Sequence, residues 1–335
     1  MPYETYFPTS PSEVFVTQSP KTRSPRAAPT DKARPRQRTT TARFGSSKRE
    51  SHDASDFYDR FGAPILSQDE HVEPCPIVDA FLCQDSRALP QIPDNSIALM
   101  VTSPPYFAGK EYEADLGENG VPASYLEYLT MLRDVFAESL RTLEPGGRMA
   151  VNVANLGRRP YRSLSADVIR ILQDDLGMLL RGEIVWVKAA GANGSCAWGS
   201  YGSAANPVLR DVTERVIVAS KGRFDRAPNR KKRAVLGLPH EDTIDKDEFR
   251  ALTLDTWHIA PESAKRVGHP APFPVDLPRK LIELYTFKDD VILDPFGGSG
   301  TVALAARTTG RRFICVDTSP EYCELAAERL AALTV

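Results

Sequence analysis

The stretch LDPFGGSGT, residues 293–301, joins an apolar run to a glycine-rich turn and then to a helical pattern. The run at 291–293 predicts a buried strand, so the order along the chain is strand, turn and helix. Glycines in such a turn let a ligand approach the backbone, and the free amides at a helix start favour a polar or anionic group. The stretch therefore predicts an α/β fold with a ligand site where this strand ends.

The turn does not match the motifs of other nucleotide-binding loops. It lacks the spacing G-x-G-x-x-G and the Gly-Lys-Ser/Thr of a phosphate loop, which disfavours dinucleotides and nucleoside triphosphates. Asp317 follows the next apolar run, 313–316, where a carboxylate can accept hydrogen bonds from ribose hydroxyls. Alone, Asp317 is equally compatible with a solvated strand end, but the turn before it favours a nucleoside-containing ligand.

The surrounding sequence repeats the alternation of strands and helices. Leucines and Phe136 recur at intervals of three and four over 124–143, which predicts an amphipathic helix that the EPGG at 144–147 ends. Further helices are predicted after Asp276, Thr301 and Pro320. The other predicted strands are apolar runs at 97–102, 149–153, 184–187 and 216–219. This pattern indicates a doubly wound, mostly parallel sheet.

A second motif, Ser103-Pro104-Pro105-Tyr106, follows the predicted strand at 97–102. Two prolines hold the chain extended and donate no backbone hydrogen bonds, so the segment presents oxygen acceptors beside an aromatic ring. A planar base that carries an amino group could bond to the Ser103 hydroxyl and the Pro104 carbonyl and stack on Tyr106. On its own the motif is equally compatible with a rigid turn.

Together these motifs resemble the DNA amino-methyltransferases of the beta class, in which the catalytic motif precedes the cofactor motif. The resemblance runs from about Cys75 to Leu333. Besides the two motifs, it rests on Gln84-Asp-Ser86, 143–151, Trp198-Gly-Ser-Tyr201 with Asn206-Pro207, 214–221 and 269–274. Asp317 departs from the family pattern, where glutamate is more usual.

The resemblance implies a Rossmann-like methyltransferase sheet that binds S-adenosylmethionine and needs no metal. Ser103, Pro104, Pro105 and Tyr106 would be catalytic. Asp317 would bind the ribose, Asp85 and Ser86 would lie near the adenine, and His269 would organise a turn. The rest of the cofactor site would comprise Phe273, Pro274, Asp294, Phe296, Gly297, Gly298, Gly300 and Thr301.

By the same resemblance, the Ser-Pro-Pro-Tyr variant indicates methylation of N4 of cytosine in duplex DNA, by base flipping and direct transfer. N6 of adenine is the nearest alternative, because a serine can accept a bond from either amine. RNA methylation and a catalytically inactive DNA-binding protein are further alternatives. A cytosine C5 mechanism would need a nucleophilic cysteine, and Cys75, between two prolines, has no link to the catalytic turn. The resemblance also allows a paired restriction endonuclease or an epigenetic role, in a monomer or homodimer.

Basic residues concentrate in two segments. Residues 21–49 contain ten basic residues and one acid, and residues 221–233 contain seven and one, although the whole chain carries a net charge of −2. The first fifty residues are rich in Ser, Thr, Pro and Arg, and no Leu or Ile precedes Ile65, so residues 1–60 are expected to form a disordered tail before a methyltransferase domain at 61–335. We expect 221–268 to be an inserted target-recognition region. Residues 107–122 are positioned to close over the flipped base, and an ordinary surface loop is an equally good interpretation of them. Phosphate contacts are predicted for Arg230, Lys231, Lys232 and Arg233.

Composition excludes several other classes of protein. No apolar run approaches the roughly 18 residues that a membrane helix needs, and the start lacks a signal-peptide pattern, which predicts a cytoplasmic, nucleoid-associated protein. The five cysteines form no CxxC pair and have no histidine at ligand spacing, which argues against a disulfide scaffold and a zinc site.

Overall fold

The computed structural model of the chain describes residues 64–105, 124–155, 161–188, 199–209, 212–262 and 273–333. The chain divides into two units, Met1–Gly62 and Ala63–Val335, and every described residue belongs to the second. The tail predicted at 1–60, Tyr106, the loop predicted at 107–122 and His269 all lie outside the described residues. Those expectations stay predictions.

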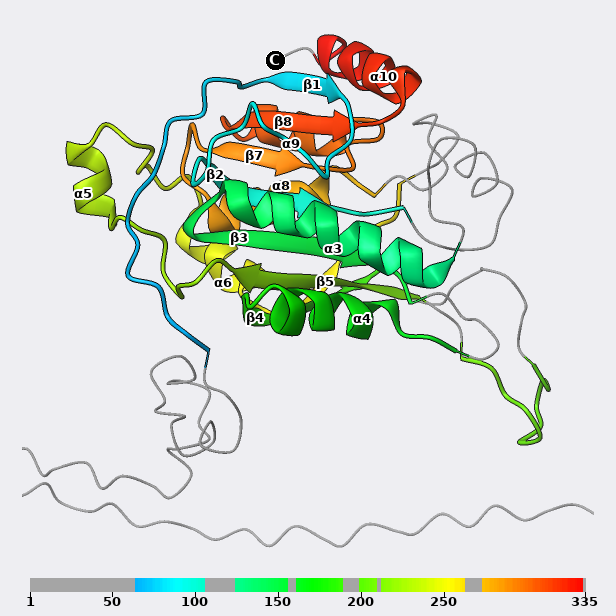
Figure 1. Cartoon of the computed structure of the whole chain (residues 1–335). Coiled ribbons are helices and arrows are strands. Elements are labelled where there is room, and N and C mark those ends of the chain that lie inside the picture. The colour runs from blue at the N-terminus through cyan, green and yellow to red at the C-terminus, as the bar shows by residue number, and fades with distance from the viewer. Residues whose placement is uncertain are drawn as a thin grey trace, which may run out of the picture. The chain divides into compact units, whose positions relative to one another are not determined.

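A single eight-stranded sheet runs in the order β1-β8-β7-β2-β3-β5-β4-β6. All of its described strands run in one direction except β5, which is antiparallel to both of its neighbours. In Figure 1 the arrow of β5 points the opposite way from those of β7 and β8. The strands are β1 (Ala80–Cys83), β2 (Ile97–Thr102), β3 (Leu143–Val153), β4 (Leu179–Val187), β5 (Thr213–Ser220), β6 (Thr256–His258), β7 (Val291–Asp294) and β8 (Arg312–Asp317).

Helices cover both faces of the sheet, which confirms the doubly wound α/β fold (Figure 1). Successive strand residues face opposite sides, so Met100 packs in the core under α3, while Leu99 packs in the core under α8. On the first face lie α3 (Tyr125–Thr142) and α4 (Leu164–Arg170), which continues as the π-helical turn η3 (Ile171–Asp175). On the second lie α6 (Lys246–Leu252), α8 (Asp276–Tyr285) and α9 (Thr301–Thr308). The remaining helices are α5 (Arg230–Val235) and α10 (Pro320–Ala331).

The sequence determines where α3 begins and ends. Ser124 and Glu127 form a reciprocal capping box at its start, and Leu143 turns to an extended conformation at its end. The start of β3 lies very close to the chain after β5, because a Cβ on Gly146 would lie 1.9 Å from the carbonyl oxygen of Asp225. Gly146 also has a φ of +76°, which glycine adopts readily. The predicted helix at 124–143 is confirmed, and strand β3 begins directly after it.

The sheet places a topological switch between β7 and β2. From β7 the chain passes through α9 to β8 on one side, and from β2 it passes through α3 to β3 on the other. Because α9 and α3 cover opposite faces, the chain leaves the carboxyl end of β7 toward one face and the carboxyl end of β2 toward the other. Ligands of open α/β sheets bind at such points.

Residues 221–262 do not form one separate insert. Ser220, at the end of the reversed strand β5, pairs with Arg148 and Leu179, so the chain after it, including α5, starts at the amino edge of the parallel strands. It then forms α6, which packs in the second core through Leu252, and returns to the carboxyl edge as β6. None of the helices in the described ranges is long and apolar enough to cross a membrane.

Candidate active site

The glycine turn after β7 is packed against β8 and α10. The amide of Gly297 donates to the carbonyl of Val316 at 2.8 Å, and the amide of Gly300 donates to the carbonyl of Gly297 at 2.8 Å. A Cβ on Gly300 would lie 2.7 Å from the Cβ of Ala326. The φ of Gly300 is +75°, a backbone conformation that residues with a side chain rarely adopt. A side chain at Gly300 would therefore collide with α10, and α9 begins directly after this residue at Thr301.

Asp317 lies beside this turn at the end of β8. One carboxylate oxygen accepts the amide of Gly298 at 2.8 Å, and the other accepts the amide of Ser319 at 2.9 Å. A carboxylate offers about four lone-pair sites, so these two bonds orient Asp317 without exhausting it as an acceptor. Asp317, the residue predicted to bind the ribose, is therefore held in place next to the glycine turn.

Asp294 is buried and connects two strands. The hydroxyl of Thr102 donates to its Oδ1 at 2.7 Å, and the amide of Phe296 donates to the same oxygen at 3.1 Å. Burial, with a smaller contribution from the nearby Asp317 carboxylate, raises the pKa of Asp294 to about 7 despite the lowering effect of these two donors. The structure gives Asp294 the role of a link between β7 and β2, and direct contact with a cofactor stays a prediction.

The turn after β1 contacts the start of the glycine turn and the end of β8. The hydroxyl of Ser86 donates to the carbonyl of Pro295 at 2.6 Å, and the amide of Gln84 donates to the carbonyl of Asp317 at 3.0 Å. Asp85 is partly exposed and forms an ion pair with Arg87 at 2.5 Å, which lowers the pKa of Asp85. The two residues predicted near the adenine thus lie at the glycine turn, although Asp85 already has a cationic partner.

Phe273 and Pro274 stand before α8, the helix that leads to β7. Phe273 is partly buried against the second core, and Pro274 is buried and accepts the amide of Leu277 at 3.0 Å. These contacts anchor the start of α8, while closure of a methionine subsite by the pair stays a prediction.

The residues Ser103, Pro104 and Pro105 follow β2 at the switch point. The amide nitrogen of Asn152, on β3, lies 3.4 Å from the hydroxyl of Ser103 and donates to Glu214 of β5 at 2.6 Å. Glu214 in turn accepts the ammonium group of Lys188 at 2.9 Å. Sequence reasoning missed this polar group, although an asparagine inside an apolar strand is a signal that could have pointed to it.

The predicted phosphate contacts need correction. Arg233 is fully buried, with an exposed fraction of 0%, and binds Glu144 at 2.9 Å, so a phosphate contact by Arg233 is wrong. Arg230 is paired with Asp242 at 2.6 Å, and Lys232 with Glu70 at 2.7 Å. All four predicted residues, including the exposed Lys231, lie on α5. Figure 1 shows α5 at the opposite end of the sheet from the carboxyl ends of the strands, where Ser103 and Asp317 lie.

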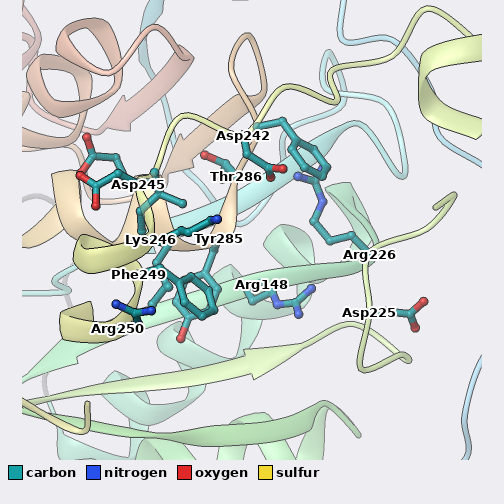
Figure 2. A pocket seen from close by; sticks show the side chains of 14 residues that line it. Arg148, Asp225, Arg226, Asp242, Asp245, Lys246, Phe249, Arg250, Tyr285 and Thr286 are labelled. Atoms are coloured by element: carbon teal, nitrogen blue, oxygen red, sulfur yellow. The ribbon is translucent and has the colours of Figure 1, made fainter. Parts of the chain in front are cut away.

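A pocket of about 760 Å³ also opens at the amino edge (Figure 2), whereas the predicted catalytic residues follow the carboxyl end of β2. It is lined by Arg148 of β3, by Arg226 after β5, and by Tyr285 and Phe287 before β7. None of the predicted site residues lines it. Within the described ranges, no group of three or more His, Cys, Asp or Glu side chains is placed to hold a metal ion.

Comparisons with known proteins agree with this arrangement. The family model of N6 and N4 methyltransferases, described as DNA methylase, matches residues 97–328. The Type II methyltransferase M.HpaI of Haemophilus parainfluenzae is 27% identical over 254 residues, which cover 74% of this chain and 73% of the relative. M.ScaI of Streptomyces caespitosus, also a Type II methyltransferase, is 29% identical over 248 residues, covering 73% and 78%.

Solved structures show the same fold. TTHA0409 of Thermus thermophilus, in complex with S-adenosyl-L-methionine, gives a TM-score of 0.56 at 27% identity and covers 75% of this chain and 94% of its own. PvuII DNA methyltransferase, described as cytosine-N4-specific, gives a TM-score of 0.56 at 22% identity and covers 80% and 92%. At that identity the second likeness concerns the fold.

Proposed function

Because the chain belongs to the DNA methylase family of N6 and N4 methyltransferases, we propose that it methylates N4 of cytosine in double-stranded DNA, with S-adenosylmethionine as donor. The observation that carries the proposal is the hydrogen bond from Thr102 to Asp294. This bond ties the strand before Ser103 to the strand before the glycine turn, so both motifs meet at one point of the sheet edge.

The residues at the glycine turn fit S-adenosylmethionine. Side chains are absent from the turn at Gly297, Gly298 and Gly300, and the Asp317 carboxylate is oriented beside them by two backbone amides. In the proposed complex the turn would admit the cofactor close to the backbone, and Asp317 would accept ribose hydroxyls. When bound, S-adenosylmethionine supplies an electrophilic methyl group on a sulfonium sulfur.

The protein's own part is to hold the amine that receives this methyl group. An exocyclic amine is a poor nucleophile because its lone pair is delocalised into the ring. Acceptors at the Ser103 hydroxyl and the Pro104 carbonyl would hold both amine hydrogens and orient the nitrogen. Serine as the first residue of the motif supports cytosine, and N6 of adenine stays the alternative because it offers the same two hydrogens.

We place the DNA over the carboxyl edge of the sheet rather than on α5. The connection from β4 to β5 starts and ends at that edge, beside Asn152 and Glu214. Its described part, 199–209, is held by the bridge between Gly199 and Pro207 and by the amide of Asn206, which donates to the Ser200 hydroxyl at 2.7 Å. This loop presents Tyr201 and Leu209 with exposed fractions of 82% and 94%. An aromatic and an apolar side chain on a braced loop suit contact with bases beside a flipped nucleotide.

The relatives M.HpaI and M.ScaI are Type II methyltransferases, which supports a role in restriction and modification for this chain as well. A paired endonuclease would then recognise the same DNA sequence. Methyl transfer from labelled S-adenosylmethionine to duplex DNA, followed by identification of the modified nucleoside, tests the proposed function.

A further inference from the structure

Four polar residues line up on one face of the sheet next to the proposed target base. They are Ser103 after β2, Asn152 on β3, Glu214 on β5 and Lys188 after β4. Their neighbours at alternate positions, Val101, Ala150, Val216 and Trp186, all pack in the second core. Since side chains alternate along a strand, the four residues project from the same face, the one that α8 covers.

Strand register brings these residues together at the carboxyl edge of the sheet. Thr102 pairs with Val151, so the next residues, Ser103 and Asn152, come at the same height on β2 and β3. On the other side Asn152 pairs with Val216, which places Glu214 further along β5 toward the carboxyl edge. The contacts follow from the pairing of the strands, so they do not depend on a surface loop.

Glu214 determines which way the Asn152 amide points. A carboxylate can only accept hydrogen bonds, so the amide group that lies 2.6 Å from Glu214 Oε2 must be the NH₂ group. The same nitrogen lies 3.4 Å from Ser103 Oγ and directs its second hydrogen there. The Ser103 oxygen therefore receives a donor from Asn152, and the hydroxyl hydrogen is turned away from Asn152.

Burial makes this arrangement costly to disturb. Asn152 has an exposed fraction of 3% and Glu214 of 8%, and a buried carboxylate requires partners for its charge. Lys188 supplies the opposite charge at 2.9 Å from Glu214 Oε1. Each oxygen of Glu214 thus has a donor, and the carboxylate is held between Lys188 and Asn152.

We propose that Asn152, Glu214 and Lys188 are positioning residues that fix the direction of the Ser103 hydroxyl for methyl transfer. The inference rests on the proposed function, in which Ser103 contacts the target amine. Glu214 acts through Asn152 and Ser103, and Lys188 acts through Glu214. The alternative is that these residues only join three strands, and the two roles differ in a measurable way.

The test is a double-mutant cycle in the full chain with duplex DNA as substrate. Glu214→Gln keeps the size of the side chain but removes the charge that determines the amide direction. We expect kcat to fall by about tenfold, equivalent to ~1.4 kcal/mol, while KM for DNA and for S-adenosylmethionine changes by less than about twofold. Ser103→Ala should lower kcat further.

The double variant separates positioning from structure. If Glu214 acts through Ser103, Ser103→Ala combined with Glu214→Gln should have the kcat of Ser103→Ala alone, because the hydroxyl to be oriented is gone. Glu183→Gln is the matched control, since Glu183 lies on β4, is half exposed and is 3.9 Å from Arg215. It should leave kcat unchanged. Multiplicative losses, or a Glu214→Gln variant with wild-type kcat, would overturn the positioning role.

A spectroscopic measurement tests the contacts without any activity. In protein labelled with ¹⁵N-asparagine, the side-chain amide protons of Asn152 should shift in both Ser103→Ala and Glu214→Gln, and should not shift in Glu183→Gln. Unchanged Asn152 resonances in both site variants would show that the hydrogen-bonded chain does not exist. If the wild-type protein transfers no methyl group, the proposed function is wrong. The Asn152 resonances would still show whether the contacts with Ser103 and Glu214 exist.

Discussion

The hydroxyl of Thr102 donates to the buried carboxylate of Asp294 at 2.7 Å, which joins the ends of β2 and β7 where the chain turns to opposite faces of the sheet. The pair lies 192 residues apart in sequence and is fully enclosed. Through it, the segment that starts with Ser103 and the turn that starts with Pro295 are held at a fixed separation. Together with the backbone pairing of β2 with β7, this bond sets the relative position of the proposed amine site and the proposed cofactor site.

The raised pKa of Asp294 should be visible in the pH dependence of the free energy of unfolding. Burial raises the pKa of Asp294 to about 7, whereas a carboxyl of this type in an unfolded chain titrates near pH 3.9. Between about pH 4 and pH 7 the folded state therefore binds the extra proton, so Asp294 makes stability fall as pH rises through this window and adds no further change above it. Asp294→Asn stays neutral and can still accept the Thr102 bond.

Urea unfolding of the wild-type chain and of Asp294→Asn, each at pH 5 and pH 8, measures this effect. From pH 5 to pH 8 the variant should gain stability relative to the wild type, by about 1.4 kcal/mol for each pH unit that lies between pH 5 and the pKa of Asp294. Identical pH dependences of the two proteins would contradict the raised pKa of Asp294.

Arg233 should be a determinant of stability. Its guanidinium group is fully buried and binds Glu144 at 2.9 Å, and Arg226 binds the same carboxylate at 2.5 Å. Removal of one partner from a buried ionic group leaves an uncompensated charge, so Arg233→Ala should lower the free energy of unfolding by about 3–5 kcal/mol. Lys231→Ala, on the exposed side of α5, should change it by less than about 0.5 kcal/mol. Equal stabilities of the two variants in urea would show that Arg233 is not buried as described.

DNA binding should depend on the loop at 199–209 more than on α5. Tyr201→Ala should weaken binding of duplex DNA, since this exposed ring lies on the loop at the carboxyl edge. Arg230→Ala combined with Lys231→Ala should leave the affinity and its salt dependence nearly unchanged, because residues at that edge would neutralise no phosphates and so release no counterions. Fluorescence anisotropy with a labelled duplex at several salt concentrations measures both. A shallower salt slope in the α5 variant with normal binding by Tyr201→Ala would reverse the placement of DNA.

Deletion of residues 1–60 tests the proposed tail. The segment lacks the apolar side chains to join a core, yet its basic residues can bind DNA phosphates without reading bases. The shortened protein should keep the melting temperature and the target sequence of the full chain, and lose nonspecific affinity at low salt. Misfolding, or methylation at a different site, would place part of the segment within the folded domain.

The apolar runs predicted the central strands well because these strands are buried on both faces. The predicted run at 97–102 coincides with β2, and those at 149–153, 184–187, 216–219, 291–293 and 313–316 lie within the longer strands observed. The edge strands β1 and β6 were missed because they contain four and three residues and carry little periodic signal.

Strand direction and distant polar contacts could not be predicted in the same way. The reversal of β5 leaves no mark in the sequence, yet it moves the basic residues of α5 to the edge away from Ser103. The charge of 221–233 suggested phosphate contacts, although Arg226 and Arg233 are buried against carboxylates. The contact between Asn152 and Glu214 joins residues 62 apart, which only strand pairing brings together.

The most direct test of the account is the identity of the methylated nucleoside. The full chain is incubated with S-adenosylmethionine that carries a labelled methyl group and with unmodified duplex DNA, and the DNA is digested to nucleosides for mass spectrometry. Ser103→Ala, whose binding of S-adenosylmethionine is checked by calorimetry, serves as the matched variant. The account predicts label in N4-methylcytosine with the wild type and a large loss of label with Ser103→Ala despite normal cofactor binding. Label found only in N6-methyladenine would contradict the assignment to cytosine, and DNA without label would contradict the proposed function itself.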